Sequence, residues 1–304
     1  MAEIVLDHVT KKIRGSTVVD DISISFAPGV VSGLKGVNGS GKTMLMRLIA
    51  GLIYPTSGEV RIDGKVIGRE ITFPESIGVL IENPAFLGNY SGYENLEMLS
   101  SIRGLVDAAR IREVLETVGL SENANKKYKK YSLGMKQRLA IALAVMHEPE
   151  VLILDEPING LDPIGIAEVR SFIRELCDAR GKTILISSHI LSEISLLADD
   201  IGIIDRGVLL EEESLKELEA KNAKFVHFIV SDASKAAQII SKLFQTKNMQ
   251  IADSYNLYLY DTTLPVAKIN RALMENGIDI KEAHLCEDTL EDYFKKITGG
   301  EGIA

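Results

Sequence analysis

The sequence feature that most constrains the fold is an eight-residue segment that fits the phosphate-binding loop pattern G-x-x-x-x-G-K-S/T at every fixed position. Its members are Gly36, Val37, Asn38, Gly39, Ser40, Gly41, Lys42 and Thr43. Because glycine lacks a Cβ atom, the backbone here can curl and direct successive N–H groups at phosphate oxygens. Lys42 adds a cation for the β- and γ-phosphates, and the Thr43 hydroxyl can bind Mg²⁺.

The segments on either side of the loop support this interpretation. Residues 29–35 are short and mostly apolar, which predicts a strand, and residues 43–50 have the apolar spacing of a helix. A helix that begins at the loop presents the positive end of its dipole to phosphate. This order predicts an α/β fold that binds a nucleotide; the alternative is an ordinary glycine-rich turn.

Composition and length exclude several other classes of protein. The 304 residues include 43 acidic and 34 basic side chains, and the net charge of −9 argues against non-specific binding of nucleic acid. The longest apolar run near the middle, residues 139–146, is far shorter than the ~20 residues of a membrane-spanning helix. The N-terminus shows no secretory signal. We therefore expect another chain to span the bilayer if this protein works at a membrane.

The chain holds two cysteines, Cys177 and Cys286, which lie far apart in the sequence. They lack the spacing of a cysteine-bound metal site, and a reducing compartment is the simplest interpretation. We expect both thiols to be buried as small apolar groups.

Apolar periodicity predicts the elements of the first two thirds of the chain. Alternating residues predict strands at 3–8, 17–19, 22–26 and 30–34. Asp63-Gly64, between two alternating runs, predicts a hairpin. Residues 91–146 have helical spacing. Residues 151–154 and 183–186 are continuous apolar runs, typical of buried parallel strands, and residues 164–179 supply the helix of a βαβ unit.

The pattern changes after an acidic segment, residues 211–224, which we interpret as a helical linker and domain boundary. Residues 225–285 then show the order strand, helix, strand, strand, helix, strand, which predicts a small two-layer α+β module. A final helix is expected at residues 290–297. We see no catalytic constellation in this module.

Two carboxylates follow the apolar strand predicted at residues 151–154. Asp155 is well placed to hold Mg²⁺ opposite the Thr43 hydroxyl, usually through water. Glu156, one residue later, can polarise an attacking water molecule. The alternative is a solvated strand end, which the preceding phosphate loop makes the weaker interpretation.

Between the loop and these carboxylates lies a segment that identifies a family. Ser132-Leu133-Gly134-Met135-Lys136 resembles the signature of ATP-binding cassette (ABC) proteins, usually Leu-Ser-Gly-Gly-Gln, with Ser132 and Gly134 matching and the other positions differing. Ser132 is placed to cap a helix that begins near Met135, and its hydroxyl, the Gly134 backbone and the helix dipole make an anion site. In the family, this site closes on the γ-phosphate bound to the other subunit.

Further family elements follow in the expected order. Asn159-Gly160-Leu161-Asp162 resembles the D-loop, with Asp162 matching. His189 resembles the switch histidine that contacts the γ-phosphate. The resemblance covers about residues 4–208 and rests on five elements in order.

Two positions depart from the family pattern. Glu82 occupies the Q-loop position where glutamine is usual; it can still hold Mg²⁺ or water, but it adds negative charge beside a polyphosphate. Ile13 stands where an aromatic side chain normally stacks on adenine, and it offers apolar contact without a π face, although the neighbouring Arg14 could stack as a cation. We expect weaker recognition of the base and some loss of preference for ATP over GTP.

The resemblance implies an α/β fold, the P-loop NTPase ABC cassette. Its core is a parallel sheet, accompanied by an antiparallel β subdomain and a helical subdomain, and a small C-terminal α+β domain follows. We assign residues 1–215 to the ATP-binding domain, with the helical subdomain at about residues 88–146, and residues 216–304 to a C-terminal accessory domain.

The implied activity is ATP hydrolysis coupled to transport. Two copies of the chain would sandwich two ATP molecules, with Mg²⁺ held at Thr43, Asp155 and Glu82. The catalytic groups would be Lys42, Glu156 and His189. Closure of the dimer would drive a separate integral membrane permease. We therefore expect a cytoplasmic protein, peripheral on the cytoplasmic face of the cell membrane, with no nucleic-acid partner.

Three segments resemble an exporter subgroup associated with self-protection against bacitracin and lantibiotics: residues 81–86, 131–138 and 289–294. The transported substrate is handled by the permease and is not encoded in these segments. One alternative is a soluble ABC-type ATPase that acts on the ribosome or nucleic acid. Such proteins usually carry two cassettes or a long coiled-coil insertion, which this chain lacks. A second alternative, a nucleotide-gated regulator without turnover, is disfavoured by Glu156 and His189.

Overall fold

The computed structural model describes residues 2–82, 84–102, 104, 106–220, 224–287 and 289–298. The chain divides into two compact units, Met1–Leu215 and Lys216–Ala304. Each unit has its own sheet and its own cluster of buried apolar side chains.

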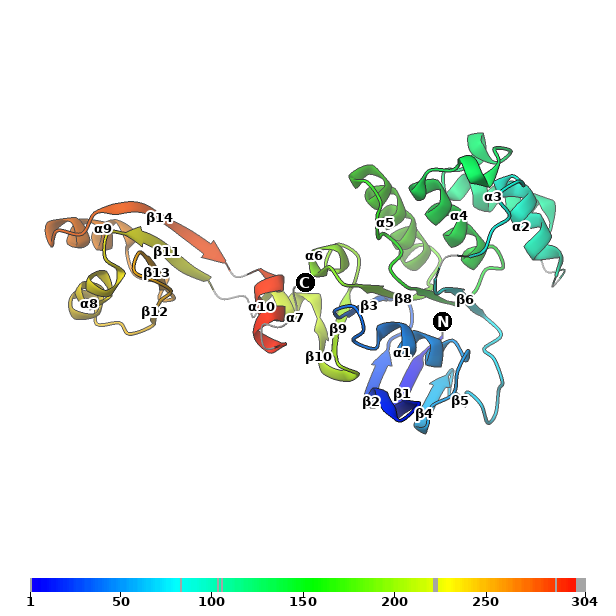
Figure 1. Ribbon diagram of the computed structural model, residues 1–304, viewed down its shortest axis with the longest axis horizontal. Helices are drawn as coiled ribbons and strands as arrows, with labels where there is room; N and C mark the ends of the chain where they lie inside the picture. Colours follow the sequence, from blue (N-terminus) through cyan, green and yellow to red (C-terminus); the bar gives the residue numbers. More distant parts are fainter. Residues whose placement is uncertain are drawn as a thin grey trace. The chain divides into compact units, whose positions relative to one another are not determined.

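A six-stranded sheet with the order β10-β9-β3-β8-β7-β6 runs through the first unit (Figure 1). All neighbouring strands are parallel except β10, which pairs with β9 in the antiparallel sense. The strands are β3 (Val31–Lys35), β6 (Ile77–Leu80), β7 (Val151–Leu154), β8 (Thr183–Ser188), β9 (Asp200–Asp205) and β10 (Val208–Ser214). Every residue of β3, β7 and β8 is buried, as expected for central parallel strands covered on both faces.

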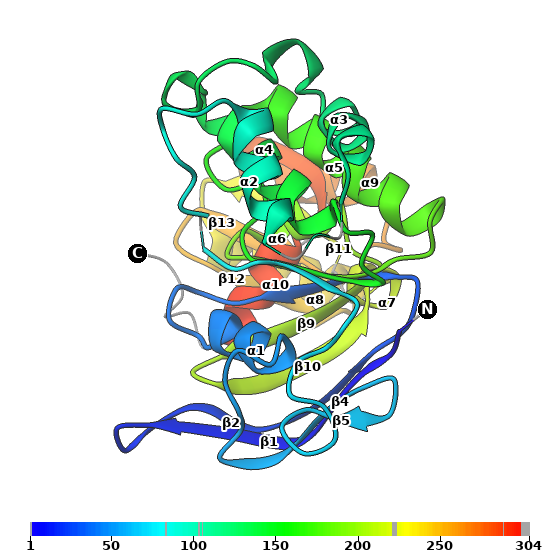
Figure 2. The same ribbon diagram turned by 90° about the vertical axis from the view of Figure 1, so that its right-hand side faces the viewer.

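A second, antiparallel sheet has the order β2-β1-β4-β5. Its strands are β1 (Ile4–Ile13), β2 (Ser16–Phe26), β4 (Ser57–Ile62) and β5 (Lys65–Val66). Helix α1 (Lys42–Ile49) lies between the two sheets (Figures 1 and 2), and its buried Leu45 and Ile49 belong to one core cluster with residues of both sheets. The predicted hairpin is confirmed, with Asp63 and Gly64 both at positive φ between β4 and β5.

Helices cover the upper part of the first unit in Figure 1. They are α2 (Gly92–Ser101), α3 (Ala108–Thr117), α4 (Leu133–Val145), α5 (Pro163–Asp178) and the short α6 (Leu191–Ile194), with 3₁₀ turns η1 (Ser121–Asn123) and η2 (Tyr128–Lys130). The helical character predicted for residues 91–146 is confirmed, and α5 crosses between the parallel strands β7 and β8 as predicted. Helix α4 begins at Leu133 and not near Met135, because Ser132 caps it.

The second unit has a sheet with the order β12-β13-β11-β14 and two helices, α8 and α9, on one face. Its elements are α7 (Leu215–Ala220), β11 (Lys224–Val230), α8 (Ala233–Phe244), β12 (Met249–Ile251), β13 (Asn256–Leu259), α9 (Val266–Glu275), β14 (Ile280–Glu287) and α10 (Leu290–Ile297). The predicted order from strand β11 to strand β14 is confirmed.

Two expectations are corrected by the structure. Residues 211–224 are not a helical linker throughout, because β10 continues to Ser214 through its pairing with β9, and the helix covers only Leu215–Ala220. Cys177 is buried as expected, whereas Cys286 is only half-buried. Within the described ranges, none of the helices combines the length and the apolar character that crossing a bilayer requires.

Candidate nucleotide-binding site

The phosphate loop joins β3 to α1 and is shaped by its glycines. Gly39 and Gly41 have φ angles of 82° and 107°, which side chains other than glycine rarely adopt. A Cβ atom on Gly36 would lie 2.3 Å from Ser40 Oγ and 2.5 Å from the Ile204 carbonyl oxygen. The loop therefore curls too tightly to admit a side chain at Gly36, and a loop of this kind can direct backbone N–H groups at a polyphosphate.

The Ser40 hydroxyl lies inside this curl. It is buried, and among the described residues it has no hydrogen-bond partner. A phosphate oxygen would supply the acceptor that this hydroxyl lacks. The loop is thus suited to a bound anion.

Lys42 is the buried cation of the site. Its Nζ atom donates hydrogen bonds to the carbonyl oxygens of Gly36, at 2.7 Å, and Val37, at 3.2 Å. Burial lowers the pKa of Lys42, and the negative charges of Glu156 and Asp155 partly oppose that effect. An ammonium group has three N–H donors, so one remains for a phosphate after the two carbonyl bonds.

Asp155 links the loop to the end of β7. The Thr43 hydroxyl donates to Asp155 Oδ2 at 2.7 Å, and the Ser187 hydroxyl donates to Asp155 Oδ1 at 2.5 Å. The Asp155 N–H donates to the Leu80 carbonyl oxygen of β6 at 2.7 Å, which fixes the backbone. A hydroxyl and a carboxylate held side by side are hard oxygen donors of the kind that Mg²⁺ prefers.

Glu156 and His189 form a pair next to this group. His189 Nδ1 lies 2.8 Å from Glu156 Oε2, and the Glu156 N–H donates to Ser187 Oγ at 2.9 Å. Because a carboxylate only accepts, His189 carries its proton on Nδ1 in this bond. Glu156 has a positive φ of 50°, so its backbone is held in an uncommon conformation at the strand end. Its Oε1 atom lies 3.9 Å from Lys42 Nζ.

Of these residues, Thr43, Asp155 and Glu156 line one cavity of about 280 Å³. It is lined by Thr43, Leu80, Glu82, Leu133, Gln137, Asp155, Glu156 and Asn159. Glu82 lines the same cavity as Thr43 and Asp155, and it also forms an ion pair with Arg47 of α1. The positive charge of Arg47 compensates for the departure from the usual glutamine.

Of the signature and D-loop segments, Leu133 and Asn159 line this cavity, whereas Ser132, Gly134 and Asp162 do not. Ser132, Gly134 and Asp162 line a second cavity of about 380 Å³ between the starts of α4 and α5. The Ser132 side chain accepts from the Met135 N–H at 3.3 Å, and the Asp162 side chain accepts from the Gly165 N–H at 2.8 Å, so each caps its own helix.

Ile13 is also separate from the loop cavity. It ends β1 at the tip of the β1–β2 hairpin and is 37% exposed, and it does not line the cavity around Thr43.

Three residues of the site were missed by the sequence interpretation: Ser187, Arg47 and Gln137. Ser187 was open to inference, because β7 and β8 are parallel with Leu154 opposite Ile186, and the next residues, Asp155 and Ser187, must then be neighbours. Arg47 and Gln137 lie on helices, and no local pattern marks their contact with the strand ends.

Comparison with known proteins gives a consistent family. Residues 19–159 match the ABC transporter family. The bacitracin transport ATP-binding protein BcrA of Enterococcus faecalis is 45% identical over 299 residues, which cover 98% of this chain and 97% of the relative. The lantibiotic transport ATP-binding protein SrtF of Streptococcus pyogenes is 41% identical over 209 residues, which cover 68% of this chain and 90% of the relative.

Solved structures agree. The ADP conformation of MJ1267, an ATP-binding cassette of an ABC transporter, is 25% identical with a TM-score of 0.64 and covers 73% of this chain and 96% of that chain. The dimeric structure of MJ0796, a bacterial ABC transporter cassette, is 24% identical with a TM-score of 0.63 over 70% of this chain and 98% of that chain, and it supports the fold alone. The chain therefore belongs to the family of ABC transporter ATP-binding subunits, ATPases that are coupled to transport.

Proposed function

We propose that this chain hydrolyses ATP to drive a separate membrane permease that exports a drug, a peptide antibiotic or a similar compound. The observation that carries the proposal is the hydrogen-bonded group formed by Thr43, Asp155, Glu156 and His189 beside the phosphate loop. The relatives named for transport of bacitracin and lantibiotics support the choice of cargo class.

The phosphate loop holds the nucleotide in this proposal. The curled backbone from Gly36 to Thr43 donates its N–H groups to the phosphates, and Lys42 adds its third N–H. Thr43 and Asp155 are the ligands for Mg²⁺, with Glu82 at the edge of the same cavity. When bound, Mg²⁺ would neutralise negative charge that develops on the phosphates.

Glu156 and His189 have different roles in hydrolysis: Glu156 acts on the attacking water and His189 on the γ-phosphate. His189 Nδ1–H occupies Glu156 Oε2, which leaves Oε1 to accept a proton from water. The same bond leaves Nε2 as the His189 nitrogen that faces the γ-phosphate, to which it donates a hydrogen bond when the imidazole is protonated. Ser187 holds both carboxylate residues in place through one hydroxyl.

The second half of each ATP site comes from a second copy of the chain. Ser132 and Asp162 line a cavity of their own, at the N-termini of α4 and α5, where helix dipoles favour an anion. We propose that this surface closes on ATP held by the phosphate loop of the partner copy, so that two ATP molecules lie between two chains.

Other parts of the chain serve this cycle. The unit 1–215 is the ATP-binding domain, with its helical part at about residues 88–146. The contact for the permease, on the cytoplasmic face of the membrane, is the groove between the Glu82 loop and the helical segment at about residues 84–120. Ile13 supplies an apolar contact for the base. The unit 216–304 is an accessory domain.

An affinity pull-down tests the proposal. Glu156→Gln protein with Mg-ATP would be captured from detergent-solubilised membranes of its host, with the same protein without nucleotide as control. Co-purification of a polypeptide with several apolar segments of ~20 residues is the expected result. Recovery of ribosomes or nucleic acid, with no such polypeptide, would overturn the transport role and favour a soluble ATPase.

A further inference from the structure

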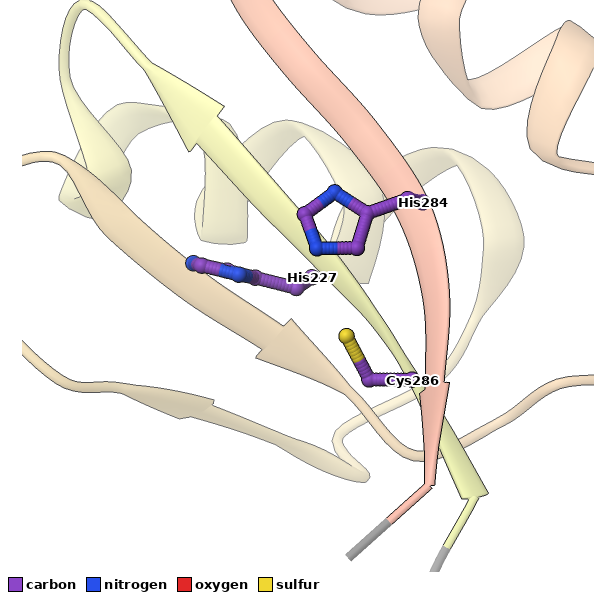
Figure 3. A group of neighbouring side chains, drawn as sticks. All are labelled: His227, His284 and Cys286. Carbon is purple, nitrogen blue, oxygen red and sulfur yellow. The ribbon is translucent and has the colours of Figure 1, made fainter.

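The second unit carries a group of three side chains that are typical metal ligands. His227 lies on β11, and His284 and Cys286 lie on β14 (Figure 3). One nitrogen from each histidine and the cysteine sulfur all lie within 4.8 Å of one another. None of these residues belongs to the cluster of buried side chains beneath the helices.

Strand register brings the three residues together. Strands β11 and β14 are antiparallel, with His227 opposite His284 and Phe225 opposite Cys286. Residues two apart on a strand share a face, so His284 and Cys286 point the same way as His227. The alternate residues Val226 and Phe228 are buried against α8 and α9, so the three ligands lie on the other face of the sheet. They are half-buried or exposed, and an ion could reach them.

A hydrogen-bonded chain orients His227. Its Nε2 atom lies 2.8 Å from Asn256 Oδ1, and Asn256 Nδ2 lies 3.0 and 2.8 Å from the two oxygens of Asp253. Because the Asp253 carboxylate only accepts, the Asn256 nitrogen must face it, and the Asn256 oxygen must accept from His227. Neutral His227 therefore carries its proton on Nε2 and has its lone pair on Nδ1. Metal-binding histidines are commonly held by such an outer partner.

We propose that His227, His284 and Cys286 bind a thiophilic transition-metal ion, with Zn²⁺ as the best fit, and leave its fourth position for water or another ligand. Tetrahedral zinc has Zn–N distances of about 2.0 Å and a Zn–S distance of about 2.3 Å, which puts ligand atoms roughly 3.5 Å apart. The three ligand atoms lie within 4.8 Å of one another, which is close to that spacing. Nitrogen and sulfur ligands disfavour Mg²⁺ and Ca²⁺, which take oxygen.

The site would be chemically distinct from the ATP site. Thr43 and Asp155 offer hard oxygen atoms, whereas the site on β11 and β14 offers two imidazoles and a thiolate. Binding there releases the thiol proton, so the affinity should rise with pH. The proposal stands whether or not the chain drives an exporter.

Zinc titration of the full-length protein tests the proposal. Chelator-treated protein would be titrated with Zn²⁺ in the absence of nucleotide, in competition with a chromophoric chelator. We expect one ion per chain, with affinity reduced more than about tenfold by Cys286→Ser or His284→Ala and about tenfold by Asn256→Ala. His8→Ala, an exposed histidine of the first unit, and Asp155→Asn should leave zinc binding unchanged.

Cobalt substitution supplies a second readout that does not depend on affinity. The Co²⁺-loaded protein should show a thiolate-to-metal charge-transfer band that Cys286→Ser removes and His8→Ala retains. Circular dichroism would confirm that each variant is folded. Zinc binding that is equal in wild type, Cys286→Ser and His284→Ala, a cobalt spectrum without the thiolate band, or no stoichiometric zinc in the wild type would each overturn the proposal.

Discussion

The nucleotide machinery that we propose for this chain consists of two half-sites that are built in different ways. In the loop half-site, defined by Lys42, Thr43, Asp155, Glu156 and His189, hydrogen bonds link helix α1 to the ends of β7 and β8, partly through Ser187, and Lys42 faces Glu156 at 3.9 Å. The signature half-site, defined by Ser132, Gly134 and Asp162, consists of two helix starts whose side chains cap their own backbones.

This difference indicates which half-site can bind nucleotide in a single chain. In the loop half-site, the Lys42 cation faces the Glu156 carboxylate at 3.9 Å, and His189 holds the other oxygen of that carboxylate. The signature half-site presents helix N-termini, which favour an anion that must come from outside. A single chain should therefore bind nucleotide through the first half-site, and the second should matter for turnover.

The largest expected effect separates binding from turnover. Ser132→Arg should lower ATP turnover by about 100-fold or more, because the added side chain blocks the surface that stabilises the γ-phosphate. Nucleotide affinity of the single chain, measured by fluorescence titration, should stay within about twofold. Ser121→Arg, in η1, is the control and should be nearly neutral. A comparable loss of nucleotide affinity in Ser132→Arg would contradict the claim that the loop half-site binds nucleotide without the signature half-site.

The next largest effect is expected from Ser187, whose hydroxyl connects Asp155 to Glu156 in the loop half-site. Ser187→Ala removes the hydroxyl that holds Asp155 Oδ1 and the Glu156 N–H, so we expect turnover to fall by about 10- to 100-fold, with a higher Mg²⁺ requirement. Steady-state kinetics at varied Mg²⁺ would measure both. Ser195→Ala, whose hydroxyl bonds only to its own helix, serves as control. Unchanged kinetics in Ser187→Ala would show that Asp155 and Glu156 hold their positions without it.

A smaller effect should come from the ion pair at the edge of the cavity. Glu82→Gln removes a negative charge near the phosphates, so ATP should bind about two- to fivefold more tightly without Mg²⁺, and the Mg²⁺ requirement should rise. Arg47→Gln leaves Glu82 uncompensated and should shift both quantities the other way. The two variants shifting in the same direction would contradict a role for this charge balance.

The smallest effect concerns stability and its pH dependence. Burial works to raise the pKa of Asp199, but hydrogen bonds from the Arg174 guanidinium, at 2.8 and 3.0 Å, and from the Val31 N–H outweigh it and hold the pKa below its ordinary value. The stabilisation is therefore present above the ordinary carboxyl pKa and is lost as the pH falls through the lowered one. Both side chains are about one third exposed, so solvent screens their interaction.

We expect Asp199→Asn to lower the free energy of unfolding by about 1 kcal/mol at neutral pH. The difference from wild type should shrink as the pH falls through the carboxyl range. Urea unfolding at a series of pH values measures it, with the exposed Asp20→Asn as control. A difference that grows towards acid pH would contradict the assigned sign.

Much of the loop half-site could be predicted from the sequence because its residues are adjacent in the chain or follow buried strands. Gly36 to Thr43 form one continuous loop, and Asp155 stands directly after an apolar run. Ser187 lies beside Asp155 because β7 and β8 are parallel neighbours with Leu154 opposite Ile186. Patterns of this kind are local, and the residue types in them predict the backbone geometry directly.

Other contacts could not be predicted, because they depend on how distant elements pack. The pair of Arg47 and Glu82 joins a helix to a loop, and the end of β10 is set by its partner β9 and not by the acidic residues it contains. His227 and Cys286 come together only through the register of two strands far apart in the sequence, so spacing along the chain gives no signal.

The central claim is that one ATP lies between the loop half-site of one chain and the signature half-site of another. The most direct test is the molar mass of Glu156→Gln, a variant that should turn over about 10²- to 10⁴-fold more slowly, measured by light scattering with saturating Mg-ATP. The account predicts a dimer with two bound nucleotides, which reverts to monomer when Ser132→Arg is added. A mass that stays monomeric with ATP bound would contradict the account.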